Sequence, residues 1–100
     1  MALTYEQAVV IADRCIRERI ATSEFFSRYQ FSDVGLKSEN ERFWTFVAGS
    51  DQLFEEGYVP GAVFACIDKQ DGHLWSREEQ EQFYETRAAA RRIEPAIRVA

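Results

Sequence analysis

Histidine and cysteine are the side chains best suited to nucleophilic, acid–base or metal chemistry, and this chain has few of them. It contains one histidine, His73, and two cysteines, Cys15 and Cys66. A catalytic dyad or a typical metal site would have to be built around His73, where the only carboxylates at ligand spacing are Asp68 and Asp71. We therefore expect His73 to be an ordinary strand or turn residue, and we predict no catalytic residue, metal or cofactor.

Both cysteines fall in apolar segments of the sequence. Cys15 lies on the apolar face of the first predicted helix, and Cys66 lies in an apolar strand. Buried free thiols pack like small hydrophobic side chains, so we expect core residues and no nucleophile or redox sensor. Two distant cysteines make no disulfide framework, which favours a reducing, cytoplasmic location.

Carboxylates form two groups that could bind an ion or transfer protons. The run Asp68–Gly72 is similar to the start of a calcium loop, but Gln70 occupies the third position, so we predict a turn. The second group follows Ser76 in a helical segment, where carboxylates without a cleft form a solvated face. Its members are Glu78, Glu79, Glu81 and Glu85.

Length and composition limit the possible classes of protein. One hundred residues, 46% of them hydrophobic, form a single domain over 1–100, with a core at about 4–90 and a basic end at 91–100. A net charge of −5 argues against nucleic-acid binding, which needs clustered basic residues. No apolar stretch is long enough to cross a membrane, and no secretory leader is visible.

The acidic residues are concentrated in one part of the chain. Residues 51–85 carry nine acids and two bases, whereas 86–100 carry four arginines and one glutamate. An acidic surface can steer a basic protein partner, although it can also serve only to keep the protein soluble. Binding residues concentrate on loops held by a sheet. The predicted partner-binding residues are therefore Asp51, Glu55, Glu56 and Asp71.

Helical spacing is clearest at the two ends of the chain. Thr4 and Gln7 form a capping box before a helix predicted over 5–20. Ser76 and Glu79 form a second box before a C-terminal helix, which Pro95 would stop or kink. The inner face of this second helix would carry Phe83, Tyr84 and Ala88.

Between these helices the sequence predicts an antiparallel sheet of three or four strands. Residues 24–36 favour a strand with a bend, with a short helix over 23–30 as the alternative. A polar turn is expected at 37–41 and a strand at 42–48, followed by a helical turn at 51–56 that Gly57 closes. The apolar run at 62–67 is typical of a central strand. A turn at 70–72 then leads into a short returning strand at 73–75. The predicted fold is α+β, with both helices covering one face of the sheet.

Aromatic residues in the predicted strands could form either core or a binding platform. Trp44 and Trp75, together with Phe43, Phe46 and Phe64, more often pack inside a sheet protein. A chaperone-like module that binds apolar segments through this sheet face is the alternative, and it requires Trp44 or Trp75 to be exposed.

The strand and turn residues resemble the YrhB-type immunity-protein family. The resemblance rests on Phe43–Phe46, on Gly57 through Pro60-Gly61, and on Ile67-Asp68-Lys69 with Gly72 closing the turn. It spans residues 4–85. The chain departs from the family in the longer run between Pro60 and Ile67 and in its arginine-rich end.

The resemblance implies a small bacterial α+β protein that neutralises a cognate toxin by direct binding, without catalysis. The family motif is structural and transfers no functional residues. Combined with the acidic surface, it predicts a partner with a basic groove, bound by this protein as a monomer or homodimer, with no nucleic acid or membrane involved.

Overall fold

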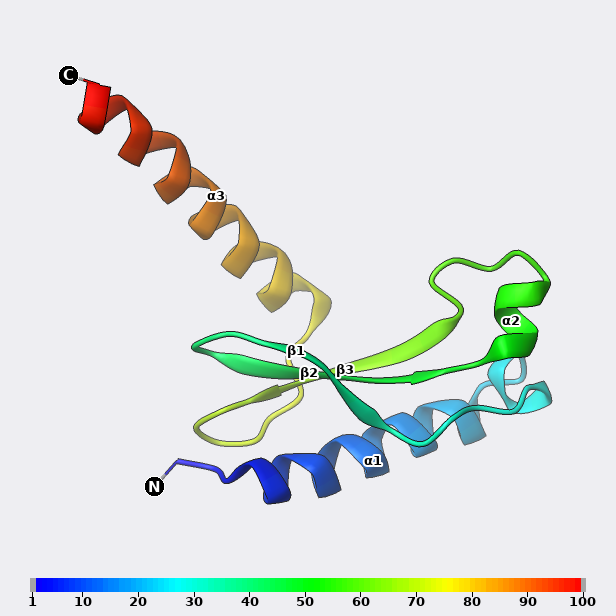
Figure 1. The fold of residues 1–100 in the computed structure, drawn as a ribbon. Helices are drawn as coiled ribbons and strands as arrows, with labels where there is room; N and C mark the ends of the chain where they lie inside the picture. The colour runs from blue at the N-terminus through cyan, green and yellow to red at the C-terminus, as the bar shows by residue number, and fades with distance from the viewer. Residues whose placement is uncertain (1, 100) are drawn as a thin grey trace.

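The computed structural model describes residues 2–99, with side chains described for 2–90. Its elements in chain order are helix α1 (Tyr5–Thr22), the 3-10 helix η1 (Phe26–Arg28), strands β1 (Gly35–Glu39) and β2 (Phe43–Gly49), helix α2 (Asp51–Glu55), strand β3 (Ala62–Asp68) and helix α3 (Arg77–Val99). The strands form one antiparallel sheet in the order β1-β2-β3 (Figure 1). The α+β class is confirmed.

Helix α1 covers one face of the sheet. Its predicted capping box is present, since Thr4 Oγ1 accepts a hydrogen bond from the Gln7 N–H (3.2 Å) and Gln7 Oε1 accepts one from the Thr4 N–H (2.9 Å). The small side chains Ala8 and Ala12 let the helix approach the strands closely, and Ile16 completes the buried stripe. They pack on strand residues that point to the same face, namely Trp44, Phe46, Ala48, Val63, Ala65 and Ile67.

The opposite face carries a smaller core, which α3 contacts. Phe43, Cys66 and Trp75 are buried together there, with Phe83 of α3 packed against them. The backbone N–H of Trp75 donates to the carbonyl oxygen of Cys66 (2.8 Å), and this bond holds Trp75 beside β3 as the chain enters α3. The expectation that both helices cover one face is therefore wrong, because α1 and α3 contact opposite faces (Figure 1).

The segment between α1 and β1 differs most from the prediction. The strand predicted over 24–36 is wrong, since this stretch contains η1 and the strand begins only at Gly35. The alternative prediction, a short helix over 23–30, is closer to the structure, although the helix that forms is a single 3-10 turn. Ser23 favours this turn because its Oγ accepts a hydrogen bond from the Phe26 N–H (3.0 Å) as α1 ends.

The polar turn predicted at 37–41 begins later, at Asn40. Its Oδ1 accepts hydrogen bonds from the N–H groups of Arg42 (2.8 Å) and Phe43 (3.0 Å), which fixes the turn directly before β2. Residues 37–39 therefore belong to β1, where Ser38 and Glu39 pair with β2 and the register shifts at Lys37. All five residues of this edge strand are exposed, which explains its polar sequence.

Strand β3 lies at the other edge, so the prediction of a central strand for 62–67 is wrong; β2 is central. Its sequence is apolar because both faces are covered, Ile67 by the α1 core and Cys66 by the smaller core. The predicted returning strand at 73–75 is reduced to one isolated bridge, between Ile67 and Leu74. The described sheet thus has three strands.

Helix α3 begins as predicted, and of the two alternatives predicted at Pro95, a stop and a kink, the stop is wrong. Ser76 Oγ accepts a hydrogen bond from the Glu79 N–H (3.1 Å) and Glu79 Oε1 accepts one from the Ser76 N–H (2.9 Å), so the second capping box is confirmed. The helix continues past Pro95 to Val99, so Pro95 does not stop it. The side chains of the basic end, 91–100, lie outside the described residues. Within residues 2–99, no helix is both long and apolar enough to cross a membrane.

Candidate protein-binding site

Helix α2 presents the three acidic residues that the sequence analysis selected in this region. Ser50 caps the helix, since its Oγ accepts a hydrogen bond from the Leu53 N–H (3.3 Å). Leu53 is buried and anchors the helix to the domain. Gly57, with a φ of 89°, ends it as predicted. Because a five-residue helix can bury only one side, its other residues face solvent.

Exposed apolar side chains gather beside α2. Phe54 is 70% exposed and Val59 is 88% exposed. Tyr58 and Phe25 are also exposed, and their rings meet edge to face at 5.2 Å between centroids. Contiguous exposed apolar surface marks interaction sites on soluble proteins. These four residues therefore form the apolar centre of a candidate interface.

Three acidic residues lie on α2 or directly after it. Asp51, Glu55 and Glu56 are exposed, and the sequence has no lysine or arginine between Phe43 and Asp68. A base that the structure shows nearby is Arg28 of η1, whose charge acts on Tyr29. The side chain of Glu56 hydrogen-bonds the Tyr29 phenol, and this bond, together with burial and the negative charge, raises the pKa of Tyr29. We call the combined surface the α2 patch. It consists of Phe25, Asp51, Phe54, Glu55, Glu56, Tyr58 and Val59.

The surface next to the α2 patch is hollowed. A cavity of about 480 Å³ lies between the 30–32 segment, α2 and Pro60. The Gln30 N–H donates to Gln52 Oε1 (2.9 Å), which ties the two walls of this cavity together. At Gly61, where φ is 63°, an added Cβ would lie 3.2 Å from the Tyr58 carbonyl oxygen. The loop that shapes the hollow therefore depends on glycine at this position.

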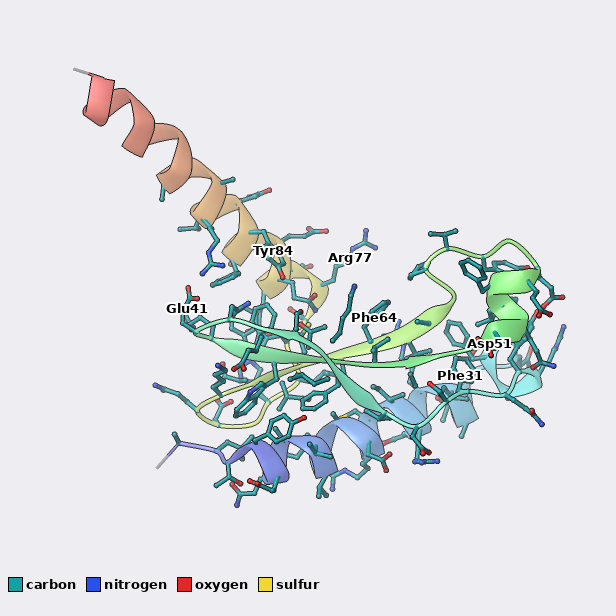
Figure 2. All side chains as sticks on the ribbon, in the orientation of Figure 1. Phe31, Glu41, Asp51, Phe64, Arg77 and Tyr84 are labelled. Atoms are coloured by element: carbon teal, nitrogen blue, oxygen red, sulfur yellow. The ribbon has the colours of Figure 1, made fainter. Side chains whose placement is uncertain are left out.

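The fourth predicted binding residue, Asp71, lies elsewhere. It follows the far end of β3, whereas α2 ends shortly before β3 begins, so a seven-residue strand separates them. Figure 2 shows Asp51 beside α2, far from Glu41 at the opposite end of the sheet. Asp71 Oδ1 accepts a hydrogen bond from the His73 N–H (3.0 Å). The structure brings Asp51, Glu55 and Glu56 together and leaves Asp71 apart.

Asp71 belongs to a cluster with Asp68 and His73, whose possible ligand atoms lie within 4.8 Å of one another. Both His73 ring nitrogens already face carboxylates, Nδ1 at 2.6 Å from Asp71 Oδ1 and Nε2 at 3.0 Å from Glu79 Oε2. These two hydrogen bonds raise the pKa of His73. The ring also stacks on Trp75, with 6.1 Å between centroids.

Asp68 makes hydrogen bonds to Trp75 and to the backbone of the 70–72 turn. Its Oδ1 accepts a hydrogen bond from Trp75 Nε1 (2.9 Å), and its Oδ2 accepts from the N–H groups of Gln70 (2.9 Å) and Asp71 (3.1 Å). Burial acts to raise the pKa of Asp68, but these hydrogen bonds lower it overall. Because these donors and acceptors are hydrogen-bonded to one another, the cluster connects the 70–72 turn to the first turn of α3.

Cys66 and both tryptophans match the predicted core, whereas Cys15 is only partly buried and belongs to neither buried cluster. Burial raises the pKa of the Cys66 thiol, which therefore stays neutral and packs as an apolar group. Trp44 is 9% exposed and Trp75 is 6% exposed. The aromatic-platform alternative required one of them to be exposed, and this requirement is not met.

The apolar centre of the α2 patch was missed by the sequence analysis. Its best signal is Phe54, which follows Leu53 in a helix of five residues. Neighbouring residues in a helix point in directions about 100° apart, so the burial of Leu53 leaves Phe54 outside. Phe25 and Tyr58 are distant in sequence, and only the folded chain brings their rings together.

Comparison with protein-family models, curated proteins and solved structures finds no match for this chain. The resemblance to the immunity proteins therefore stays a prediction, and the geometry of the α2 patch has to carry the functional argument.

Proposed function

We propose that this protein is a non-catalytic immunity protein that binds and neutralises a toxin with a basic surface, and that the α2 patch makes the contact. The observation that carries the proposal is the exposed apolar pair Phe54 and Val59, which lies close in the chain to the exposed acidic residues Asp51, Glu55 and Glu56.

The α2 patch has the composition of a protein interface. Aromatic residues at the centre of an interface supply most of its binding energy, and polar residues at the rim exclude water from them. Phe54, Tyr58 and Phe25 would act as these central anchors. Asp51, Glu55 and Glu56 would act mainly on the association rate, because surface charges steer a partner of opposite sign.

The charge of the α2 patch supports a basic partner. Toxins that act on nucleic acids or nucleotides carry basic grooves, and an acidic inhibitor can cover such a groove. The resemblance to immunity proteins points to the same partner class. The proposed location is the cytoplasm, where both free cysteines would stay reduced.

The proposal predicts that a neighbouring open reading frame encodes a toxin domain, and it is tested by co-expressing the protein with that domain; a neighbourhood without one would contradict the proposal. The wild-type chain should restore growth, and Phe54→Ser should reduce the rescue because it removes the largest exposed anchor. Val10→Ser is the matched control, since Val10 is 68% exposed on α1, outside the α2 patch. Circular dichroism of both variants should show an unchanged fold.

Full rescue by Phe54→Ser would contradict the role of the α2 patch. Equal loss of rescue in Phe54→Ser and Val10→Ser would contradict it as well, because the effect would then not be specific to this surface. Turnover of a small molecule by the purified chain would contradict a non-catalytic function.

A further inference from the structure

Hydrogen bonds between separate segments of the chain fix the walls of the hollow beside the α2 patch. The Ser32 N–H donates to the Gly49 carbonyl oxygen (2.8 Å), and Ser32 Oγ accepts from the Gly49 N–H (3.2 Å). The Ser50 N–H donates to the Gly61 carbonyl oxygen (3.0 Å). Because these bonds form within the chain itself, the walls are in place before any ligand arrives, and a site of this kind loses little entropy on binding.

Gly49 leaves the hollow open. It lies opposite Ala62 in the pairing of β2 with β3, and both residues line the hollow. The φ of Gly49 is not positive, and a Cβ added there would meet nothing within 4 Å beyond its chain neighbours. The backbone therefore does not require glycine at this position, in contrast to Gly61. The space in front of Gly49 is room for a group from outside the chain.

Asp51 supplies the charge of the hollow. The other residues of its lining are glutamine, serine, glycine, alanine, proline and phenylalanine, all of them neutral. Asp51 is exposed, and within the described residues 2–90 its carboxylate makes no hydrogen bond or ion pair. A cation complements this charge, whereas an anion is repelled by it. The hollow therefore favours a positively charged occupant.

The aromatic residues of the lining favour one kind of cation. Phe54, which is 70% exposed, and the half-buried Phe31 both line the hollow, and Figure 2 shows Phe31 and Asp51 at the same end of the sheet. A planar guanidinium group stacks on aromatic rings and donates two parallel hydrogen bonds to a carboxylate. A lysine ammonium is more strongly hydrated and lacks this planar fork. The volume of about 480 Å³ lies in the range of sites that enclose small ligands.

We infer that this hollow binds the side chain of an arginine, with the Asp51 carboxylate accepting hydrogen bonds from the guanidinium group and Phe54 packing against it. The inference rests on the proposed function, because the basic partner would supply the arginine. Phe54 belongs both to the hollow and to the apolar centre of the α2 patch. An arginine in the hollow would therefore lie within the proposed contact surface, and it names one side chain that the partner must present.

The test titrates the full chain with N-acetylarginine amide and follows the backbone amide signals by two-dimensional ¹H–¹⁵N NMR. Signals of Gly49, Asp51, Gln52 and Gly61 should shift and saturate, with a dissociation constant on the order of 1–10 mM for so small a ligand. N-acetyllysine amide carries the same charge without the planar group and should bind at least about fivefold more weakly. Neither probe requires the toxin, so the result is independent of the partner's identity.

Three variants locate the binding. Asp51→Asn keeps the shape of the side chain but removes its charge, and it should weaken binding of the arginine probe about tenfold. Glu24→Gln is the matched control, because Glu24 is an exposed acid that does not line the hollow, and it should bind the probe like wild type. Gly49→Leu fills the hollow without touching the carboxylate and should abolish binding. Circular dichroism should show an unchanged fold in all three.

Several results would overturn the inference. They are the absence of saturable shifts, equal affinity for the two probes, equal weakening by Asp51→Asn and Glu24→Gln, or unchanged binding in Gly49→Leu. Failure here is distinguishable from failure of the proposed function. Absent probe binding with reduced rescue by Phe54→Ser would refute only the arginine site, whereas probe binding with full rescue by Phe54→Ser would support this site and refute the contact through the α2 patch.

Discussion

Asp68 shows how one buried carboxylate can organise an end of the sheet. It terminates β3, holds the 70–72 turn through two backbone N–H groups and accepts the indole N–H of Trp75. The sequence analysis identified the turn but interpreted Asp68 only as a weak candidate ion ligand. One of its three hydrogen bonds depends on the position of Trp75 in space, which composition and spacing do not specify.

We expect Trp75→Phe to destabilise the fold through Asp68. The substitution leaves Asp68 Oδ1 buried without its indole donor, and a lost partner of this kind costs about 1–3 kcal/mol. Urea unfolding followed by circular dichroism measures the change. Phe83→Leu serves as the control for lost aromatic volume in the same core, since the phenylalanine ring donates no hydrogen bond. An equal loss of unfolding free energy in the two variants would contradict a special role for the hydrogen bond between Trp75 and Asp68.

His73 should make stability depend on pH. Its hydrogen bonds to Asp71 and Glu79 raise its pKa in the folded state above the ordinary value of 6.5. A raised pKa means that the stabilisation is complete below pH 6.5 and is lost as the pH rises through the folded-state value. We predict a melting temperature that falls over this range.

Thermal unfolding of wild type and His73→Gln checks this prediction. Because the chain has one histidine, the variant should lack most of the pH dependence and melt like wild type at the alkaline end. The same pH dependence in both proteins would contradict the assignment to His73.

At the scale of elements, local signals were sufficient wherever a single short motif sets a boundary. The two capping boxes placed the starts of α1 and α3, and Gly57 placed the end of α2. The prediction for residues 24–34 failed because the aromatic residues there are held by tertiary contacts and not by strand pairing, and Phe26 and Phe31 pack against the α1 core. Phe25, for example, contacts Tyr58, which is distant in sequence.

The Ser76 cap should contribute measurably to α3. Ser76→Ala removes the oxygen that accepts the Glu79 N–H, and loss of such a cap costs about 1 kcal/mol. Ser76→Thr keeps an acceptor and should unfold near the wild-type midpoint. Urea midpoints of the three proteins give the comparison, and an alanine variant as stable as wild type would show that the cap is dispensable.

At the scale of the whole molecule, the surface proposed to bind a partner lies at one end of the sheet. The α2 patch follows Gly49 at that end, whereas α3 packs beside Phe43 at the other end. The sequence predicted the acidic charge, because charge density can be read directly from composition, and three of the four residues it predicted to bind a partner lie together in the α2 patch. It did not predict which acidic residues share a surface, since that depends on which end of β3 each one occupies.

The central claim is that the α2 patch recruits a basic protein partner. The most direct test is the association rate with the purified toxin domain from the neighbouring open reading frame, measured by stopped flow at several salt concentrations. Glu55→Lys with Glu56→Lys should slow association about tenfold at low salt and flatten its salt dependence. Glu6→Lys with Glu18→Lys, which makes the same charge change on the exposed side of α1, should have a much smaller effect. If both double variants associate at the wild-type rate, or slow association equally, the claim is contradicted.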